Sequence, residues 1–296
     1  MTEKITKILF DTDIGSDIDD AIALAYLLAN PNCELLGITT VSGQPLERAK
    51  LASAICKSAE MNIPIIPGHN DRIDGATRQP DVPQKIVLSK LDHDKEFNNI
   101  DAVEFMAETI RENPNEVALL AVGPMTNLAN LFTRHPDTPS LLKSLQLMIG
   151  RFSDNHGLPV SEWNAHCDPT AASMVYSTIT PKHTSIGLDL TYQVVMSSTE
   201  VKQHFQHPIL KPVYEMSKVW FESREEIRFH DPLAAVALFD DSICTYVRGR
   251  VNVLRSSDRS DGETQLSDDY NGPHRVGITV NSERFFESYF SVFNQT

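Results

Sequence analysis

The sequence is short of positive charge. Its 296 residues contain 26 lysines and arginines against 40 aspartates and glutamates, which gives a net charge of −14 at pH 7. A surface this acidic repels polyanions, so we expect neither nucleic acid nor an anionic membrane as a partner. The charge is compatible with a small ligand that is neutral or cationic.

Long apolar runs and paired cysteines are also missing. No run reaches the ~18 apolar residues of a membrane span, and no basic segment followed by an apolar one suggests a signal peptide. The four cysteines (Cys33, Cys56, Cys167 and Cys244) are scattered and lack the spacing of a metal site. We interpret them as reduced thiols and expect a cytoplasmic protein.

Strand and helix patterns alternate along most of the chain. Apolar residues make up 41% of the sequence, enough for a large core. Buried-strand patterns occur at 34–41, 63–66, 116–122, 145–149 and 183–190, and helical patterns lie between them. This order predicts an α/β fold with an open, mainly parallel, doubly wound sheet and helices on both faces, with residues 1–296 forming one domain.

Several later or longer segments depart from this alternation. The segment 69–99 is polar, contains Pro80 and Pro83, and exceeds an ordinary connection, so we interpret it as a functional loop or a lid. Residues 200–228 show a helical pattern in two pieces. Near the end of the chain, a polar loop at 256–272 joins two patterns of antiparallel or edge strands, 243–254 and 274–280.

The most informative stretch runs from residue 8 to residue 25, where an apolar strand pattern, a turn at Gly15 and a helical pattern follow one another. Its acidic residues are Asp11, Asp13, Asp17, Asp19 and Asp20. Acids are common at helix starts, but that does not account for Asp11 and Asp13, which end the strand. Ligands of open α/β sheets bind at such strand ends. Carboxylates so close together repel unless a cation compensates, and Ca²⁺ or Mg²⁺ suits such ligands.

Two known acidic patterns fit this stretch poorly. An EF-hand loop counted from Asp11 would need Gly at Ser16 and Glu at Ile22. A phosphatase of the haloacid dehalogenase type would use Asp11 as nucleophile and Asp13 as acid. It would also need a downstream Lys and a second acidic pair at a strand end. The pair at 240–241 follows a helical pattern instead.

The stretch resembles the nucleoside hydrolase signature Asp-x-Asp-x-Gly-x-Asp-Asp-Ala, with two extra residues before the Asp pair. Four later segments resemble family segments in the same order. These are residues 37–43, 121–129, Glu162-Trp163-Asn164 with Asp168-Pro169, and His230-Asp231-Pro232. The resemblance spans nearly the whole chain, so the protein is identified as a divergent member of the family, of the inosine–uridine preferring type.

The resemblance implies an enzyme that uses Ca²⁺ to hydrolyse the N-glycosidic bond of ribonucleosides, giving ribose and free base in purine or pyrimidine salvage. The implied ion ligands are Asp13, Asp20, Asp231 and the backbone carbonyl of Val122. Asp19 would be the general base, although Asp17 competes with it because the two extra residues make the alignment ambiguous. His230 would protonate the leaving base.

The substrate side follows the family less closely. The expected substrate-binding residues are Asn164, Glu162, Gln44 and Met148. Gln44 stands where the family usually has Asn, the His-Gly-rich loop is absent from 69–97, and 148–151 replaces the usual Met-Gly-Gly-Gly. The resemblance therefore supports the type of reaction more strongly than it supports any particular base preference. A non-catalytic nucleoside or sugar binder, or a hydrolase of another ribosyl compound, stays an alternative. We expect a homo-oligomer, either a dimer or a tetramer.

Overall fold

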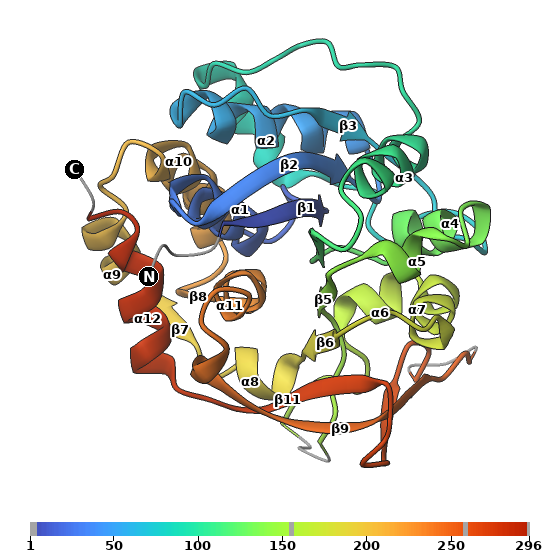
Figure 1. Cartoon of the computed structure of the whole chain (residues 1–296). Coiled ribbons are helices and arrows are strands. Elements are labelled where there is room, and N and C mark those ends of the chain that lie inside the picture. Colours follow the sequence, from blue (N-terminus) through green and yellow to red (C-terminus); the bar gives the residue numbers. More distant parts are fainter. Residues whose placement is uncertain (1–4, 154–156, 257–259, 295–296) are drawn as a thin grey trace.

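The computed structural model describes residues 5–153, 157–256 and 260–294. Within them, the main sheet has nine strands in the order β10-β9-β11-β6-β5-β4-β1-β2-β3 (Figure 1). The strands are β1 (Thr6–Thr12), β2 (Cys33–Thr40), β3 (Ile65–Pro67), β4 (Val117–Ala121), β5 (Ser144–Met148), β6 (His183–Ile186), β9 (Cys244–Val253), β10 (Thr264–Asp268) and β11 (His274–Val280). From β3 to β11 the neighbours pair parallel, and β9 and β10 extend the sheet antiparallel. The predicted open, mainly parallel sheet is confirmed.

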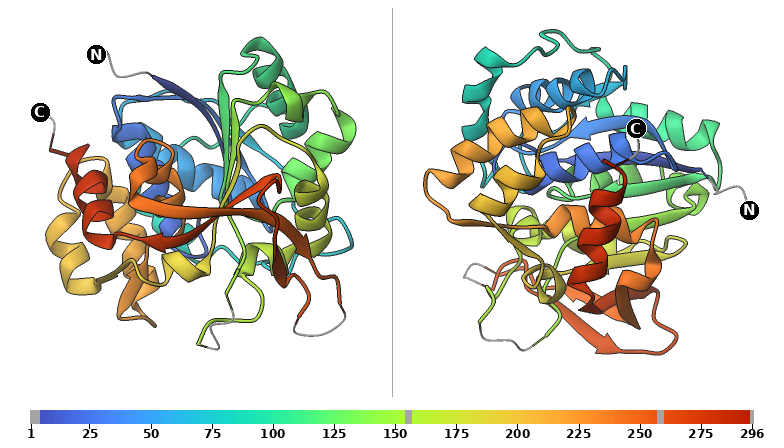
Figure 2. Two further views of the ribbon diagram at one scale, coloured as in Figure 1. Left: turned by 60° about the horizontal axis from the view of Figure 1, so that its bottom comes forward. Right: turned by 90° about the vertical axis from the view of Figure 1, so that its left-hand side faces the viewer.

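Helices cover both faces of the sheet (Figures 1 and 2). One apolar cluster joins the sheet to α1 (Asp19–Ala29), α2 (Pro45–Ser58), α10 (Leu210–Phe221), α11 (His230–Ala237) and α12 (Ser282–Ser291). The other joins it to α3 (Ala102–Glu112), α4 (Thr126–Arg134) and α7 (Pro169–Ser177). Ile8 and Phe10 belong to the first cluster and Leu9 to the second, as expected for a strand buried on both faces.

Shorter elements complete the described chain. They are η1 (Pro83–Lys90), α5 (Thr138–Leu141), α6 (Trp163–Cys167), α8 (Leu188–Thr191), α9 (Ser198–His204), η2 (Asp241–Ile243) and the two-stranded sheet of β7 (Val195–Ser197) and β8 (Glu226–Arg228). No helix in the described segments has the length and hydrophobicity that a bilayer crossing requires. The assignment of residues 1–296 to one domain stays a prediction.

The order of the strands reverses beside β1, which has β2 on one side and β4 on the other. Ligands of doubly wound sheets bind outside the carboxyl ends of the strands at such a point. Asp13 follows β1 and Val122 follows β4, so both lie there. Gly123 allows the two strand ends to approach, because a Cβ at this position would lie 2.9 Å from Asp13 Oδ1.

The turn between β1 and α1 depends on Gly15. Its φ is +114°, a conformation that side-chain-bearing residues rarely adopt, and a Cβ there would lie 2.6 Å from atoms of Leu51 and Val82. The turn leads directly into α1, where almost every residue is buried. The acids at the start of α1 are consequently buried as well, which confirms the predicted strand, glycine turn and helix.

Some local predictions were wrong. The strand expected over 183–190 ends at Ile186, because the chain turns at Gly187 and forms α8. The helical pattern of 200–228 ends in β8. The polar loop of 256–272, of which 257–259 lie outside the described residues, contains the edge strand β10. The long segment 69–99 is a loop as predicted, but it includes η1.

Candidate active site

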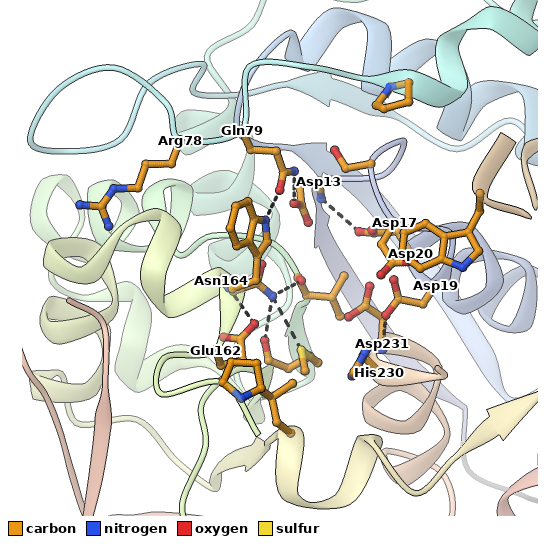
Figure 3. A pocket seen from close by; sticks show the side chains of 18 of the residues that line it. Asp13, Asp17, Asp19, Asp20, Arg78, Gln79, Glu162, Asn164, His230 and Asp231 are labelled. Carbon is orange, nitrogen blue, oxygen red and sulfur yellow. Dashed lines mark hydrogen bonds between the residues drawn. The ribbon is translucent and has the colours of Figure 1, made fainter. Parts of the chain in front are cut away.

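A cavity of about 580 Å³ opens at the carboxyl ends of β1, β4 and β5 (Figure 3). Its walls come from segments that are far apart in the sequence. The lining residues include Asp13, Asp17, Asp19 and Asp20 after β1, Arg78 to Asp81 and Pro83 of the long loop, Val122 and Met148, Glu162 to Asn164, and Tyr192, Trp220, Arg224, His230 and Asp231. The predicted switch point of the sheet is thus a pocket.

Three buried carboxylates form a cluster on the floor of this pocket. One oxygen each from Asp19, Asp20 and Asp231 lies within 4.8 Å of the others. The backbone N–H of Asp231, at the start of α11, donates to Asp19 Oδ2 at 3.2 Å. Burial, together with repulsion between the carboxylates, raises the pKa of all three groups well above its ordinary value. A cation would offset this cost, so the set fits a metal ion that prefers oxygen ligands.

Asp13 and Val122, the other two predicted ion ligands, border this cluster. The Asp13 N–H donates to Asp20 Oδ1 at 3.2 Å, and the Asp13 carboxylate accepts from Gln79 Nε2 at 2.5 Å. The Val122 carbonyl lines the pocket and accepts from Asn164 Nδ2 at 2.5 Å. The structure thus brings all the predicted ion ligands to one pocket, and it adds Asp19 to the carboxylate cluster.

The predicted ribose-binding residues lie at the start of α6. The Glu162 carboxylate caps this helix and accepts from the Asn164 N–H at 2.7 Å. Burial raises the pKa of Glu162 to about 7, while hydrogen bonds from backbone N–H groups oppose that rise. The Asn164 amide also donates to the carbonyl of Met148 at 3.1 Å. Asn164, Glu162 and Met148 therefore lie together in the pocket, as predicted.

His230 and Asp17 also reach the pocket. Nδ1 of His230 lies 2.6 Å from Thr191 Oγ1. Burial lowers the pKa of His230 to about 3, with a smaller effect of the Arg228 cation, so the imidazole is neutral near pH 7. Asp17 lines the pocket but is not part of the carboxylate cluster, to which Asp19 belongs.

Asp11 and Gln44, which the sequence analysis considered as site residues, lie outside the pocket. The carboxylate of Asp11 accepts from Thr39 Oγ1 at 2.5 Å and from Asn127 Nδ2 at 2.7 Å, and it does not line the pocket. This position does not fit the nucleophile of a phosphatase. The structure does not bring Gln44 into the pocket either. Its amide donates to the carbonyl of Pro80 at 2.7 Å, so Gln44 fastens the long loop.

Arg48 of α2 is a structural residue that the sequence analysis missed. It is fully buried and donates to the backbone carbonyls of Gly43 at 2.9 Å and Ile14 at 3.1 Å. It also donates to the carbonyl of Asp13. Burial raises the pKa of the Asp13 carboxyl, and the Arg48 cation opposes that rise. Arg48 therefore supports the turn that carries the acids and supplies a counter-charge beneath it.

Comparisons with known proteins bear on the family and the fold of this chain. The family model of inosine-uridine preferring nucleoside hydrolases matches residues 8–287. The pyrimidine-specific ribonucleoside hydrolase RihA of Escherichia coli O8 (strain IAI1) is 26% identical over 294 residues, 92% of each chain. A solved plant nucleoside hydrolase has a TM-score of 0.85 at 23% identity, over 98% of this chain and 99% of the other. The purine-preferring ribonucleoside hydrolase from Gardnerella vaginalis has a TM-score of 0.84 at 21% identity, over 97% and 98%. These structural matches show a common fold.

Proposed function

Because the chain belongs to the family of inosine-uridine preferring nucleoside hydrolases and is thus an enzyme that cleaves N-glycosidic bonds, we propose that the pocket of Figure 3 is its active site and that it holds one Ca²⁺ ion. The substrate is a ribonucleoside, and the products are ribose and the free base. The family match and the intact acidic residues support this enzyme over a non-catalytic binder.

The observation that carries the proposal is the buried carboxylate cluster of Asp19, Asp20 and Asp231. Burial and repulsion between carboxylates raise the pKa values of these groups, so a cation bound among them would offset the cost of their charge. We assign the ion to Asp13, Asp20, Asp231 and the carbonyl of Val122. These oxygens, with water and substrate hydroxyls, can supply the ~6–8 ligands that Ca²⁺ prefers.

When bound, the ion would acidify a water molecule and hold hydroxyls of the ribose. Asp19 is placed beside the ion ligands, and its carboxylate takes the proton of the attacking water. The water oxygen bonds to the anomeric carbon as the bond between that carbon and the base nitrogen breaks. Asn164 and Glu162 line the same pocket and orient the ribose through its hydroxyls.

The leaving base takes up the electron pair of the broken bond and needs a proton. His230 supplies this proton as an imidazolium and returns to the neutral ring. Burial favours the neutral ring in the free pocket, so the imidazolium forms once the substrate is bound and negative charge develops on the base. Nδ1 of His230 lies 2.6 Å from the Thr191 hydroxyl, which can accept from this nitrogen or donate to it. Thr191 thus holds the ring through Nδ1 and leaves Nε2 to deliver the proton.

The proposal is tested by release of free base from a panel of ribonucleosides and their 2′-deoxy partners, with Ca²⁺ present. A site that ligates the ribose diol leaves the ion and Asn164 without a partner when a hydroxyl is missing. We expect every 2′-deoxy partner to react much more slowly, while changes of base alter the rate less steeply. Equal rates on both sets would contradict the role of the diol. No release from any riboside would contradict the proposed activity.

The setting of the enzyme is part of the proposal. The four cysteines are all free in the structure, which supports a reducing compartment such as the cytoplasm. A cytoplasmic enzyme that releases bases from nucleosides suits nucleoside salvage. The expected dimer or tetramer stays a prediction, which size-exclusion chromatography with light scattering would test.

A further inference from the structure

Gln79 belongs to the long loop of residues 69–99 and forms part of the pocket wall, where it is only 7% exposed. Its Nε2 donates to Asp13 Oδ2 at 2.5 Å (Figure 3). Its Oε1 accepts a hydrogen bond from the indole N–H of Trp163. Trp163 is 52% exposed at the mouth of the pocket. One amide therefore joins a carboxylate inside the pocket to an aromatic ring at its mouth.

The chemistry of the two partners fixes the orientation of this amide. An indole N–H can only donate, so it must face the amide oxygen of Gln79. A charged carboxylate can only accept, so Asp13 must face the amide nitrogen. Turning the amide over would oppose two donors at Trp163 and two acceptors at Asp13. Each contact thus enforces the other.

The loop backbone near Gln79 is fastened to two strand ends. The carbonyl of Pro80 accepts from Gln44 Nε2 at 2.7 Å, and Gln44 follows β2. The N–H of Gln84 donates to the carbonyl of Gly15 at 3.1 Å in the turn after β1. These bonds limit where the Gln79 side chain can reach and direct it into the pocket.

We propose that Gln79 is a positioning residue for Asp13, and that its bond to Trp163 couples the mouth of the pocket to the ion site. The inference rests on the proposed function, in which Asp13 is an ion ligand. Holding one carboxylate oxygen restricts the rotation of the group before the ion arrives, which lowers the entropic cost of binding. The long loop then supports the ion site in addition to lining the pocket.

The first test is the Gln79→Met variant, which keeps the length of the side chain and removes both hydrogen bonds. We expect Ca²⁺ to bind about 10- to 100-fold more weakly to the full-length variant in isothermal titration calorimetry, the usual effect of losing a partner of a metal ligand. Gln84→Met is the matched control. Gln84 is buried in the same loop, but its amide donates to the backbone carbonyl of Asp17 at 2.8 Å. Equal weakening in both variants would show a loosened loop and overturn the proposal.

The second test is the Trp163→Phe variant, which keeps an aromatic ring and removes the N–H. Because Trp163 is half exposed, this variant should fold even if Gln79→Met does not. We expect weaker Ca²⁺ binding, by a smaller factor than in Gln79→Met. In the double variant Gln79→Met/Trp163→Phe, the two losses of Ca²⁺ affinity should not multiply, because Gln79→Met alone already removes the hydrogen bond to Trp163. Fully multiplicative losses would refute the coupling.

Fluorescence gives a readout that does not depend on activity. The chain has two tryptophans, so the Trp220→Phe variant emits from Trp163 alone. We expect saturating Ca²⁺ to change this emission, and the change to disappear when Gln79→Met is added. A wild-type protein that binds no Ca²⁺ would refute the proposed function itself. A wild-type protein that binds Ca²⁺ while Gln79→Met binds it equally well would refute only this inference.

Discussion

The Asp20→Asn variant should be more stable than the wild-type protein without Ca²⁺ and should gain little stability when Ca²⁺ is added. The amide oxygen of Asn can still accept from Thr12 Oγ1 and the Asp13 N–H, which bond to Asp20 Oδ1 at 2.5 and 3.2 Å. The substitution therefore removes charge and preserves shape. Without an ion, it removes a buried carboxylate whose pKa is raised by burial and by repulsion from Asp13 and Asp17.

The expected size of the ion effect follows from linkage. An ion that binds only the folded protein stabilises it by about 2.7 kcal/mol at a concentration of about 100 times Kd. With an unfolding entropy of ~2.1 cal/mol/K per residue, 296 residues lose stability at about 0.6 kcal/mol per degree near the midpoint. The melting temperature of the wild-type protein should thus rise by about 4 °C, and that of Asp20→Asn by less than about 1 °C.

Scanning calorimetry on chelator-treated protein, with and without added Ca²⁺, measures both quantities. Asp81→Asn is the matched control, because Asp81 lines the same pocket but is exposed. It loses the same charge and should keep the full Ca²⁺-dependent rise. The assignment of the ion to these carboxylates would be refuted if Ca²⁺ did not change the melting temperature of the wild-type protein. It would also be refuted if Asp20→Asn showed the full Ca²⁺-dependent rise.

Two further substitutions test the base and a buried histidine. Asp19→Asn should lower kcat at least about a hundredfold, the low end for loss of a general base, and still bind Ca²⁺ at saturation, whereas Asp17→Asn should lose much less activity. The reverse pattern in steady-state assays would make Asp17 the base. His183 is fully buried, and burial lowers its pKa from 6.5 to about 3. The unfolded chain therefore takes up this proton first, so the contribution of His183 to stability falls as the pH drops from 6.5 towards 3, by at most about 1.4 kcal/mol per pH unit. The buried carboxylates, whose pKa values are raised, act in the opposite direction in every variant, so the comparison with His183→Phe isolates the histidine. Between pH 7 and pH 5, urea unfolding should show a change in stability that is less favourable in the wild-type protein than in His183→Phe, and equal changes would contradict the role of His183.

The sequence predicts the fold and the acidic side of the pocket well because both depend on local patterns. The apolar run that ends at Phe10 forms β1, and Gly15 makes the sharp turn into α1. This short path alone determines that Asp13, Asp19 and Asp20 meet at a strand end. Asp231 joins them from α11, and it was found because its His-Asp-Pro segment resembles one of the family.

The residues that the sequence analysis misplaced or missed depend on contacts without a local pattern. Gln44 stands where the family usually has Asn, which suggested a pocket residue, but its φ of 58° is in the left-handed region and its side chain is bonded to the long loop. Gln79 contacts Asp13 across 66 residues of sequence. Nothing in the polar composition of residues 69–99 marks this one glutamine. A rare residue type would have been a better guide, because both tryptophans of the chain line the pocket.

The two sides of the pocket are built by different parts of the fold, and this bears on substrate preference. The acidic side comes from strand ends and helix starts that the apolar core fixes in place. The opposite side draws on the long loop and on Trp220 at the end of α10. A purine-preferring hydrolase shares the fold with a TM-score of 0.84, and a pyrimidine-specific relative is 26% identical. We expect the base preference of this chain to depend on the peripheral segments of the pocket rather than on the sheet. Since Gln79 lies on one of these segments and contacts Asp13, a change in the loop that alters base preference should also alter Ca²⁺ affinity.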